Sequence, residues 1–445
     1  MLRTIIKREI QEYLKSAKFL IGFLITVALI TISTLINLND FKQRQDDCQA
    51  AREEKEGPFY RITIYRAPEA LSVLVQGKDR KLGNKLEISS NYLPSRLSGY
   101  MGQALSQHQG YRAGFEAVDF AFVVRIVLSL LVIFLAYNAV AEEKSNGTLK
   151  LALANSLPRD KLLFGKFISG GVVVLGSLVI AAIMALLLMI SDPAISLGAS
   201  DWARILGMLG ISAFYLLGFY ALSLFVSVKV NRPATSLMVL LQVWVFLLII
   251  YPSLGIFLAG KFYRLPNEEE ISGQREAVSK PIMEEMEKNR AAIMDAQKKG
   301  QRWSTDLSKK NSELLSRQAE ANYMIDLELN NMYSVQAHLA KRISIFSPAV
   351  LYDDAMLRLA RTGMDEYENF MAAVPGFWKQ LVERDKLMYQ DREAYQKSKL
   401  PEFSYSREST ARSLTGAAVE ISLLFMFVVV FFSLAYTGFL RKDVR

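Results

Sequence analysis

Six apolar stretches limit the possible folds of this chain more than any other feature. A membrane-crossing helix needs about 20 apolar residues. One such run also fits a buried core helix, but six runs, several of them longer than this minimum, predict a multi-pass membrane protein. The predicted spans are Phe19–Leu38, Ala121–Ala141, Phe167–Ile190, Ile205–Val228, Ala234–Leu258 and Leu414–Leu440.

The N-terminal region, residues 1–38, is predicted to form an interfacial helix followed by the first span. Residues 2–16 place Leu2, Ile5 and Ile10 on one face and basic side chains on the other, which favours a helix lying in the inner interface. An ordinary extension of the first span is the alternative. The span ends in LINLNDFKQR, which has no small-residue cleavage pattern, so we expect it to remain as an anchor.

The distribution of Lys and Arg predicts the orientation in the membrane. Four short segments hold 15 basic and six acidic residues, a net charge of +9 that equals the charge of the whole chain: 1–18, 142–166, 229–233 and 441–445. Short basic segments face the cytoplasm, so both termini are predicted to be cytoplasmic, with the protein in the inner cell membrane. No basic groove with interleaved aromatic residues indicates nucleic-acid binding.

Two long segments are expected on the extracytoplasmic side. Residues 39–118 are predicted to form an α+β domain, with a polar helix first and then strands in PFYRITIYR, LSVLVQG and KLEIS. Residues 259–413 are predicted to form a helical-hairpin domain. The remaining divisions are 119–258, which holds spans two to five, and 414–445, which holds the sixth span and the tail.

The predicted hairpin consists of two helices of unequal length. The first covers Pro281–Lys299, with Ser279 as its cap and Gly300 as its stop. The second runs from about Ser304 to Arg342 and would reach on the order of 60 Å. Two ordinary packed helices are the alternative to a long stalk. Two or three further helices are expected after Ser347-Pro348.

Two charged residues lie inside predicted spans. Arg125 and Glu420 both stand about six residues from the outer end of their spans. A lone charge within the membrane costs roughly 2.5–3.5 kcal/mol on insertion scales. We expect the two residues to pair with each other or to line an outward-facing cavity; the alternative is that each reaches the outer headgroups.

Nothing in the sequence indicates an enzyme, and no catalytic, cofactor-binding or metal-ligating residue is predicted. Residues 160–166 lack the glycine that begins a Walker A loop, because that position is Asp160. The chain has two histidines, His108 and His338, and one cysteine, Cys48. These are too few for a structural zinc site.

The segment 142–166, EEKSNGTLKLALANSLPRDKLLFGK, is a short basic loop between two spans. Gly147 allows the chain to turn and Thr148 can cap a short helix. Leu149, Leu151 and Leu153 give that helix apolar faces, and Pro158 ends it. The pattern indicates a helix that docks another protein or rests on lipid headgroups.

This loop resembles the first cytoplasmic loop of ABC-2 type transporter permeases. The matching features, in order, are Glu143, Gly147-Thr148-Leu149, the helix Lys150–Leu157, Arg159 and Gly165-Lys166. The family's Gly-Glu-Arg-Glu opening is Ala-Glu-Glu-Lys here. Trp244, Pro252, the segment Ile343–Gly363 and the ending LRKDVR are also similar to the family, in a branch with large external insertions.

The resemblance implies a permease subunit of an ATP-driven exporter-type complex. The loop helix would then sit on a cytoplasmic ATPase subunit, which would bind ATP and Mg²⁺; no cofactor is expected in this chain. The implied coupling residues are Glu143, Gly147, Thr148, Leu149, Leu151, Leu153, Arg159 and Arg232. A second permease, identical or different, would complete a dimer in contact with membrane lipids.

Two other functions remain open at this point. In one, ATP hydrolysis moves the external domains so that they act on an extracytoplasmic partner, and no cargo crosses the membrane. In the other, the chain is a scaffold or receptor without ATPase coupling. A change in the 142–166 loop would leave function unaltered only in the last case.

Overall fold

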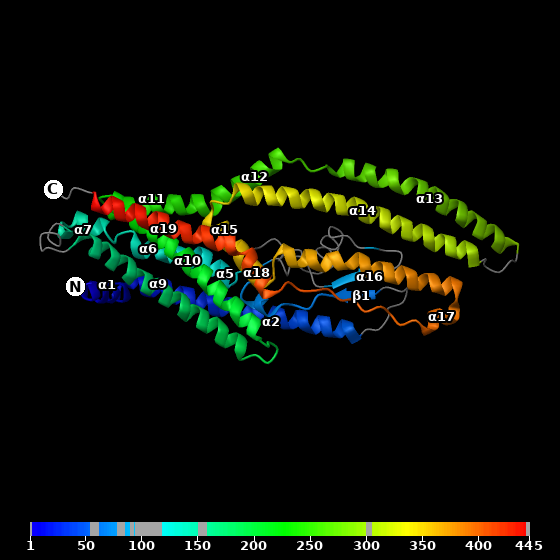
Figure 1. Ribbon diagram of the computed structural model, residues 1–445, viewed down its shortest axis with the longest axis horizontal. Helices are drawn as coiled ribbons and strands as arrows, with labels where there is room; N and C mark the ends of the chain where they lie inside the picture. Colours follow the sequence, from blue (N-terminus) through cyan, green and yellow to red (C-terminus); the bar gives the residue numbers. More distant parts are fainter. Residues whose placement is uncertain are drawn as a thin grey trace.

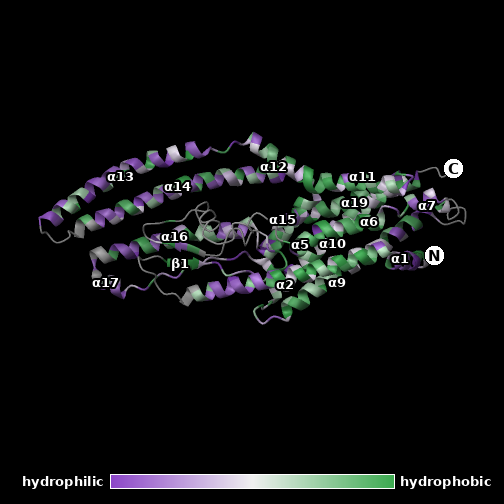
Figure 2. Ribbon diagram, turned by 180° about the vertical axis from the view of Figure 1, so that it is seen from behind, coloured by the Kyte–Doolittle hydropathy of each residue, from purple (hydrophilic) through white to green (hydrophobic). Residues whose placement is uncertain are grey.

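The computed structural model describes residues 2–53, 62–77, 85–89, 93, 118–149, 158–299 and 305–441. The molecule is an elongated assembly of helices, with an apolar bundle at one end and a polar extension at the other (Figures 1 and 2). The first helix, Leu2–Lys15, and the end of the last helix, Ala418–Leu440, lie at the far end of the bundle (Figure 1). We call this end of the bundle the loop end. We call the opposite end of the bundle, which carries the extension, the polar end.

Among the described residues, six helical stretches are long and apolar enough to cross a membrane, as the sequence predicts. They are Ala17–Ala50, Phe120–Ser145, Arg159–Ile190, Ala199–Lys229, Pro233–Phe262 and Ala418–Leu440. Helices suit this setting because they satisfy every backbone hydrogen bond within the segment. The helix α10 (Ala199–Lys229) lies at the centre and packs against the second, third, fifth and sixth spans.

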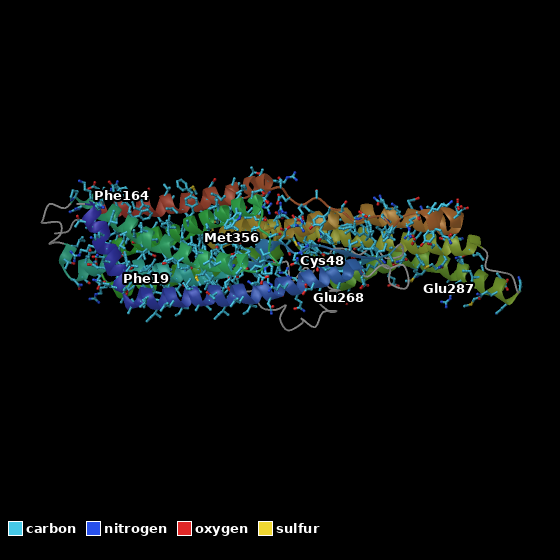
Figure 3. The ribbon with its side chains drawn as sticks, turned by 90° about the horizontal axis from the view of Figure 1, so that it is seen from below. Phe19, Cys48, Phe164, Glu268, Glu287 and Met356 are labelled. Atoms are coloured by element: carbon cyan, nitrogen blue, oxygen red, sulfur yellow. The ribbon has the colours of Figure 1, made fainter. Side chains whose placement is uncertain are left out.

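The chain begins with a helix that packs on the bundle. The helix α1 (Leu2–Lys15) confirms the predicted N-terminal helix, and it lies against α9 (Arg159–Ile190). After Ser16 the helix α2 (Ala17–Glu53) crosses the bundle and continues well beyond its apolar part. The predicted polar helix after the first span is therefore the end of α2, and it carries the buried Cys48 (Figure 3).

Two spans contain wide helical turns. The second span consists of α5 (Phe120–Phe122), the π-helix η2 (Val123–Leu128), α6 (Ser129–Ala136) and, after a turn, α7 (Ala141–Ser145). The fifth consists of α11 (Pro233–Val245), the π-helix η3 (Phe246–Ile250) and α12 (Tyr251–Phe262). In the fifth span Pro252 cannot donate a backbone hydrogen bond, which accounts for the irregular turn just before it.

The predicted α+β segment contains two of its three expected strands. The strands β1 (Ile62–Tyr65) and β2 (Lys85–Ile88) pair antiparallel, with Ile62 opposite Ile88. The predicted strand in LSVLVQG is wrong, because Ala70–Val73 forms the 3₁₀ turn η1. The continuous apolar run is instead buried in the interface between this segment and the bundle core.

The predicted hairpin is present, but its first helix begins earlier than expected. The helix α13 (Glu268–Lys298) starts at the capping box formed by Asn267 and Glu270 and passes through Pro281. Ser279 is therefore not a cap; its Oγ accepts a hydrogen bond from Gln318 at 2.6 Å. The predicted stop, Gly300, lies outside the described residues.

The second hairpin helix, α14 (Thr305–Ile343), agrees with the predicted range and runs beside α13 (Figure 1). Its 39 residues span on the order of 60 Å. Further helices follow as expected: α15 (Pro348–Ala360), α16 (Met364–Gln390) and α17 (Arg392–Lys397), and then α18 (Thr410–Gly416) leads into α19 (Ala418–Leu440).

The two long polar segments share one hydrophobic core. Ile64, Leu86 and Ile88 from the strands are buried against Phe370 and Trp378 of α16. The Trp378 indole also donates a hydrogen bond to the carbonyl oxygen of Ser89 at 3.2 Å. The segments predicted as two domains therefore pack together as one unit over this core.

Candidate functional site

The described parts of the loop 142–166, which are α7 and the start of α9, lie at the loop end, near α1 and the end of α19 (Figure 1). The structure describes residues up to Leu149 and again from Pro158. Gly147 has a φ of 73°, the left-handed conformation that favours glycine. The predicted turn at Gly147 is therefore present. Leu151, Leu153 and the rest of the predicted helix Lys150–Leu157 lie outside the described residues.

The start of the loop is bound to the end of α10. The Lys144 ammonium donates to the carbonyl oxygens of Ser227 and Val230, each at 3.1 Å, and also to that of Val228. The Ser227 hydroxyl in turn accepts from the backbone N–H groups of Val140 and Ala141 at 3.0 Å. The last carbonyls of a helix have no partner within it, so a lysine at this position satisfies them and complements the helix dipole.

A buried ion cluster joins α1, α7 and α9 at the loop end. Lys166 of α9 is 3% exposed, and its ammonium is 2.7 Å from Glu9 of α1 and 2.8 Å from Glu143 of α7. Removing one member of a buried ion group leaves an uncompensated charge, which costs about 3–5 kcal/mol. The cluster therefore holds the two ends of the loop and the N-terminal helix in one arrangement.

Close contacts between helices surround this cluster. The Tyr220 hydroxyl donates to the carbonyl oxygen of Lys166 at 2.8 Å and lies 3.3 Å from the Tyr13 hydroxyl. A Cβ at Gly170 would lie 1.9 Å from the Tyr220 hydroxyl, and one at Gly165 would lie 2.9 Å from Ile5. Glycine is needed at both positions because α1, α9 and α10 approach so closely.

The structure places the remaining described coupling residues in different roles. Leu149 is 2% exposed and packs into the bundle core, so it anchors the loop instead of presenting an apolar surface. Thr148 donates to the carbonyl oxygen of Glu143 at 3.2 Å. Arg159 donates to the last carbonyl of α19, at Leu440, over 3.1 Å. Arg232 is exposed at the turn that precedes α11.

The two charged residues inside the spans, Arg125 and Glu420, were expected to pair with each other. Each has a different partner. Arg125 pairs with Asp353 of α15. Glu420 pairs with Lys341 of α14 at 3.1 Å. The predicted pair between Arg125 and Glu420 is therefore replaced by separate ion pairs, each with a residue that lies beyond the fifth span in the sequence.

The polar end of α10 also contacts the extension. Arg204 is fully buried and donates to the carbonyl oxygen of Glu408 at 3.2 Å, and Arg361 donates to the same oxygen. Arg361 has a φ of 57°, which is unusual for a residue other than glycine. Further along α10, the Ser212 and Tyr352 hydroxyls lie 3.2 Å apart.

These contacts make α10 a continuous connection between the two ends. Its last residues hold the loop through Lys144 and Ser227, and its first turns hold α15 and the segment before α19. Tyr215, in the middle, donates to the backbone of the second span at Arg125 over 3.0 Å. A displacement of the loop would therefore act directly on a helix that also contacts the extension.

Several of these residues have roles that the sequence did not predict. Lys144 and Ser227 were not expected to join the loop to α10, and Glu9 was not expected to pair with Lys166. Asp353 and Lys341 were not expected to bind the intramembrane charges. One usable signal was Glu9, one of two acids among the basic residues of α1. Another was the Asp353-Asp354 pair within an apolar helix.

The Trp244 and Pro252 positions that resemble the family lie near the wide turns. The Trp244 indole donates to the Ser129 hydroxyl at 2.9 Å and so links the fifth span to the second. Ser129 Oγ also donates to the carbonyl oxygen of Arg125 at 2.5 Å, within the π-helix η2. Single π turns inside α-helices are frequent at functional sites.

Comparison with known proteins matches the family model described as ABC-2 family transporter protein over residues 3–444. A protein of Stutzerimonas stutzeri described as the probable ABC transporter permease protein NosY is 29% identical over 173 residues. That match covers 37% of this chain and 61% of the relative, so it spans less than two thirds of the relative's length. With its six apolar spans and a family match over nearly its whole length, the chain belongs to the ABC-2 family of transporter membrane proteins.

Proposed function

We propose that this chain is the permease subunit that couples a separate cytoplasmic ATPase to the movement of a substrate across the inner membrane. The loop end faces the cytoplasm, because the short basic segments gather there. The polar extension then lies outside. ATP and Mg²⁺ bind to the ATPase subunits, and a second permease completes the complex.

The observation that carries this proposal is the bonding of the loop to α10. Lys144 binds three carbonyl oxygens at the end of α10, and the Lys166 cluster fixes both ends of the loop. A force applied to the loop by the ATPase would therefore reach α10 through these bonds. Because α10 also contacts α15 and the second span, its tilt would rearrange the bundle and the extension together.

The long hairpin supports a second candidate function. The helices α13 and α14 project beyond the bundle, and α14 is joined to α19 through the pair between Lys341 and Glu420 (Figure 1). In this alternative, ATP hydrolysis moves the hairpin so that it acts on an extracytoplasmic partner without transport. Reconstituted complexes that hydrolyse ATP in response to such a partner, and accumulate no substrate, would favour it.

The coupling proposal is tested at Gly147. A Cβ there would meet nothing within 4 Å, so the effect of a substitution comes from the backbone conformation alone. Asparagine tolerates the left-handed conformation and valine does not. We expect Gly147→Val to lose co-purification of the ATPase subunit and Gly147→Asn to retain it. Membrane insertion of both variants, measured by extraction and gel filtration, is the control.

A second set of variants compares the predicted docking positions Leu151 and Leu153 with the buried Leu149. Leu151→Asp with Leu153→Asp should abolish capture of the ATPase, whereas Leu149→Asp should reduce folded protein, because Leu149 is buried. Unchanged ATPase capture and stimulation in the Leu151/Leu153 double variant would contradict the coupling proposal and favour the scaffold function.

A further inference from the structure

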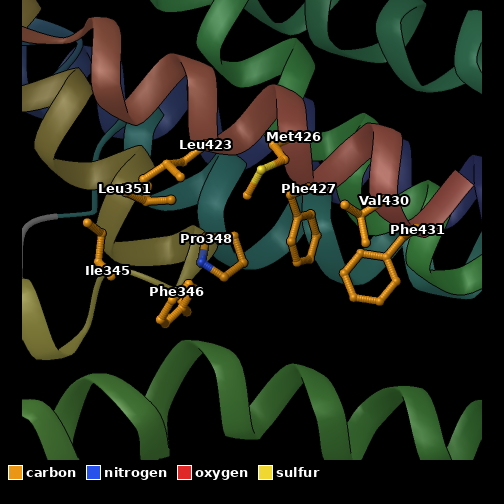
Figure 4. Close-up of a pocket in the computed structure, with 9 residues that line it drawn as sticks. All are labelled: Ile345, Phe346, Pro348, Leu351, Leu423, Met426, Phe427, Val430 and Phe431. Carbon is orange, nitrogen blue, oxygen red and sulfur yellow. The ribbon is translucent and has the colours of Figure 1, made fainter. Parts of the chain in front are cut away.

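An apolar pocket lies between α19 and the turn that joins α14 to α15 (Figure 4). Its volume is about 120 Å³, and nine apolar side chains line it. Five of them come from α19, among them Met426, Val430 and Phe431, and Phe346 lies exposed at its side. The pocket therefore opens beside the exposed Phe346 and offers no polar side chain to a ligand inside it.

The pocket lies at a depth that only bilayer components reach readily. Its lining residues on α19 begin five residues after Ala418 and end at Phe431. At 1.5 Å per residue, they lie about 7–20 Å from the polar end of this span. This interval lies inside a hydrocarbon core about 30 Å thick and reaches from one half to just past its midplane. An occupant of the pocket is therefore an apolar chain supplied by the membrane.

Charged residues surround the polar end of the pocket. Lys341 binds Asp354, and it lies 3.1 Å from Glu420. Each of these charged residues lies one helical turn from a residue that lines the pocket: Lys341 from Ile345, Asp354 from Leu351 and Glu420 from Leu423. The apolar pocket thus has an ionic rim on the side of the extension.

The rim carries charges of both signs. Burial alone would lower the pKa of Lys341, but its hydrogen bonds and ion pairs with Asp354 and Glu420 outweigh this effect and raise the pKa, so the residue stays charged. Arg342, the next residue, is exposed, and no ion pair to it is found within the described ranges. The rim therefore has one cation and two carboxylates, and Arg342 follows its cation in α14 as a second, exposed positive charge. Glu420 Oε2 is buried and accepts no hydrogen bond from the described residues.

We propose that this pocket binds one acyl chain of a membrane phospholipid whose headgroup carries both a phosphate and an ammonium group. The chain lies against α19, the phosphate accepts from Arg342, and the ammonium donates to Asp354, whose side chain is 30% exposed. A headgroup with both charges matches the rim, whereas a purely anionic headgroup leaves the two carboxylates without a new partner.

The bound lipid would connect the bilayer to the part of the chain that leads into the extension. The α14–α15 turn both lines the pocket and positions the helix that pairs with Arg125. The inference rests on the membrane placement of the six spans. It does not depend on ATPase coupling, so a loss of ATPase capture leaves it unaffected and the two proposals fail separately.

The test uses the full chain in lipid nanodiscs that contain phosphatidylethanolamine with a photoactivatable group on one acyl chain. Cross-links are mapped by mass spectrometry. We expect preferential labelling at Met426 and Val430 over Phe425 and Val429, which lie on the same helix, are exposed and do not line the pocket. Equal labelling at the two sets would show ordinary contact with bulk lipid and would overturn the proposal.

Two variants on α19 test occupancy of the pocket itself. Val430→Trp should fill the cavity and reduce labelling at Met426 about tenfold, the change that corresponds to loss of 1.4 kcal/mol of binding. Val429→Trp adds the same side chain outside the pocket and should leave labelling unchanged. Gel filtration and thermal unfolding verify that both variants remain folded. Equal labelling in the two variants would contradict the proposed binding mode.

The headgroup is tested with a phosphatidylglycerol probe that has the same acyl chain. We expect phosphatidylethanolamine to label the pocket residues more strongly than phosphatidylglycerol. Asp354→Asn should reduce this preference, while Arg342→Gln should reduce labelling by both probes. Equal labelling by the two probes in the unaltered protein, or an unchanged preference in Asp354→Asn, would show that the rim does not recognise an ammonium group.

Discussion

The ion pairs at the two ends of the bundle differ in how far their cations are buried. At the loop end, Lys166 is 3% exposed and binds two carboxylates. At the polar end, Arg125 and Asp353 are 15% and 30% exposed. The two sites therefore differ in the cation: the Lys166 ammonium is enclosed, whereas its partners Glu9 and Glu143 are 15% and 29% exposed, much like the polar-end pair. The comparison indicates a loop end that moves as one rigid unit and a polar end whose ion pairs can exchange during a conformational change.

The largest expected effect tests the rigidity of the loop end. Lys166→Met leaves Glu9 and Glu143 close together without their cation. We expect a loss of about 3 kcal/mol in the free energy of unfolding, the low end for a broken buried ion pair, because Glu9 and Glu143 are 15% and 29% exposed and keep part of their hydration. Thermal unfolding of the purified protein in detergent measures this change.

A matched triple variant separates charge from packing at this site. Lys166→Met combined with Glu9→Gln and Glu143→Gln removes all three charges and should recover much of the lost stability. If the single variant is as stable as the unaltered protein, the Lys166 cluster does not hold the loop end together, and the contrast between the two ends fails.

The second prediction compares packing at the two ends through glycine-to-alanine changes. A Cβ at Gly170 would overlap the Tyr220 ring, whereas one at Gly207 would meet the flexible side chain of Leu359 at 3.1 Å. Overpacking typically costs about 1–3 kcal/mol. We therefore expect Gly170→Ala to destabilise within this range and Gly207→Ala to have a much smaller effect in the same unfolding assay.

Gly176, in the same helix as Gly170, supplies the control. A Cβ there meets nothing within 4 Å, so Gly176→Ala should gain up to about 1 kcal/mol from helix propensity. If Gly170→Ala were equally stabilising, the close approach of α9 and α10 would not exist in solution. If Gly207→Ala cost as much as Gly170→Ala, the polar end would be as tightly packed as the loop end.

The sequence predicted the elements of this fold better than their contacts. The six spans, the N-terminal helix and the long α14 follow from hydrophobic periodicity, which is a local property of the chain. The segment LSVLVQG was mispredicted because a short apolar run fits a strand or a buried turn equally well. Ser279 was mispredicted as a cap because α13 continues through Pro281 without ending.

The site was predicted in its location but not in its bonding. Gly147 was identified correctly as a turn, since only its own backbone conformation was at issue. Leu149 was expected on the docking surface, but burial depends on which other helices lie behind it. The partners of Arg125 and Glu420 are more than 200 and 75 positions away along the chain, so spacing alone offered no means to find them.

The smallest expected effect concerns the ion pair between Arg125 and Asp353 at the polar end. It tests whether this pair can break and form again. In a double-mutant cycle, Arg125→Met and Asp353→Asn should show a coupling of about 1 kcal/mol or less, because both side chains are partly exposed. The matched cycle at the loop end, Lys166→Met with Glu9→Gln, should give a clearly larger coupling. A strong coupling at Arg125 would mean that the polar end is also locked. Movement of α10 would then have to carry the extension along as a rigid body, instead of breaking and remaking the ion pairs around α15.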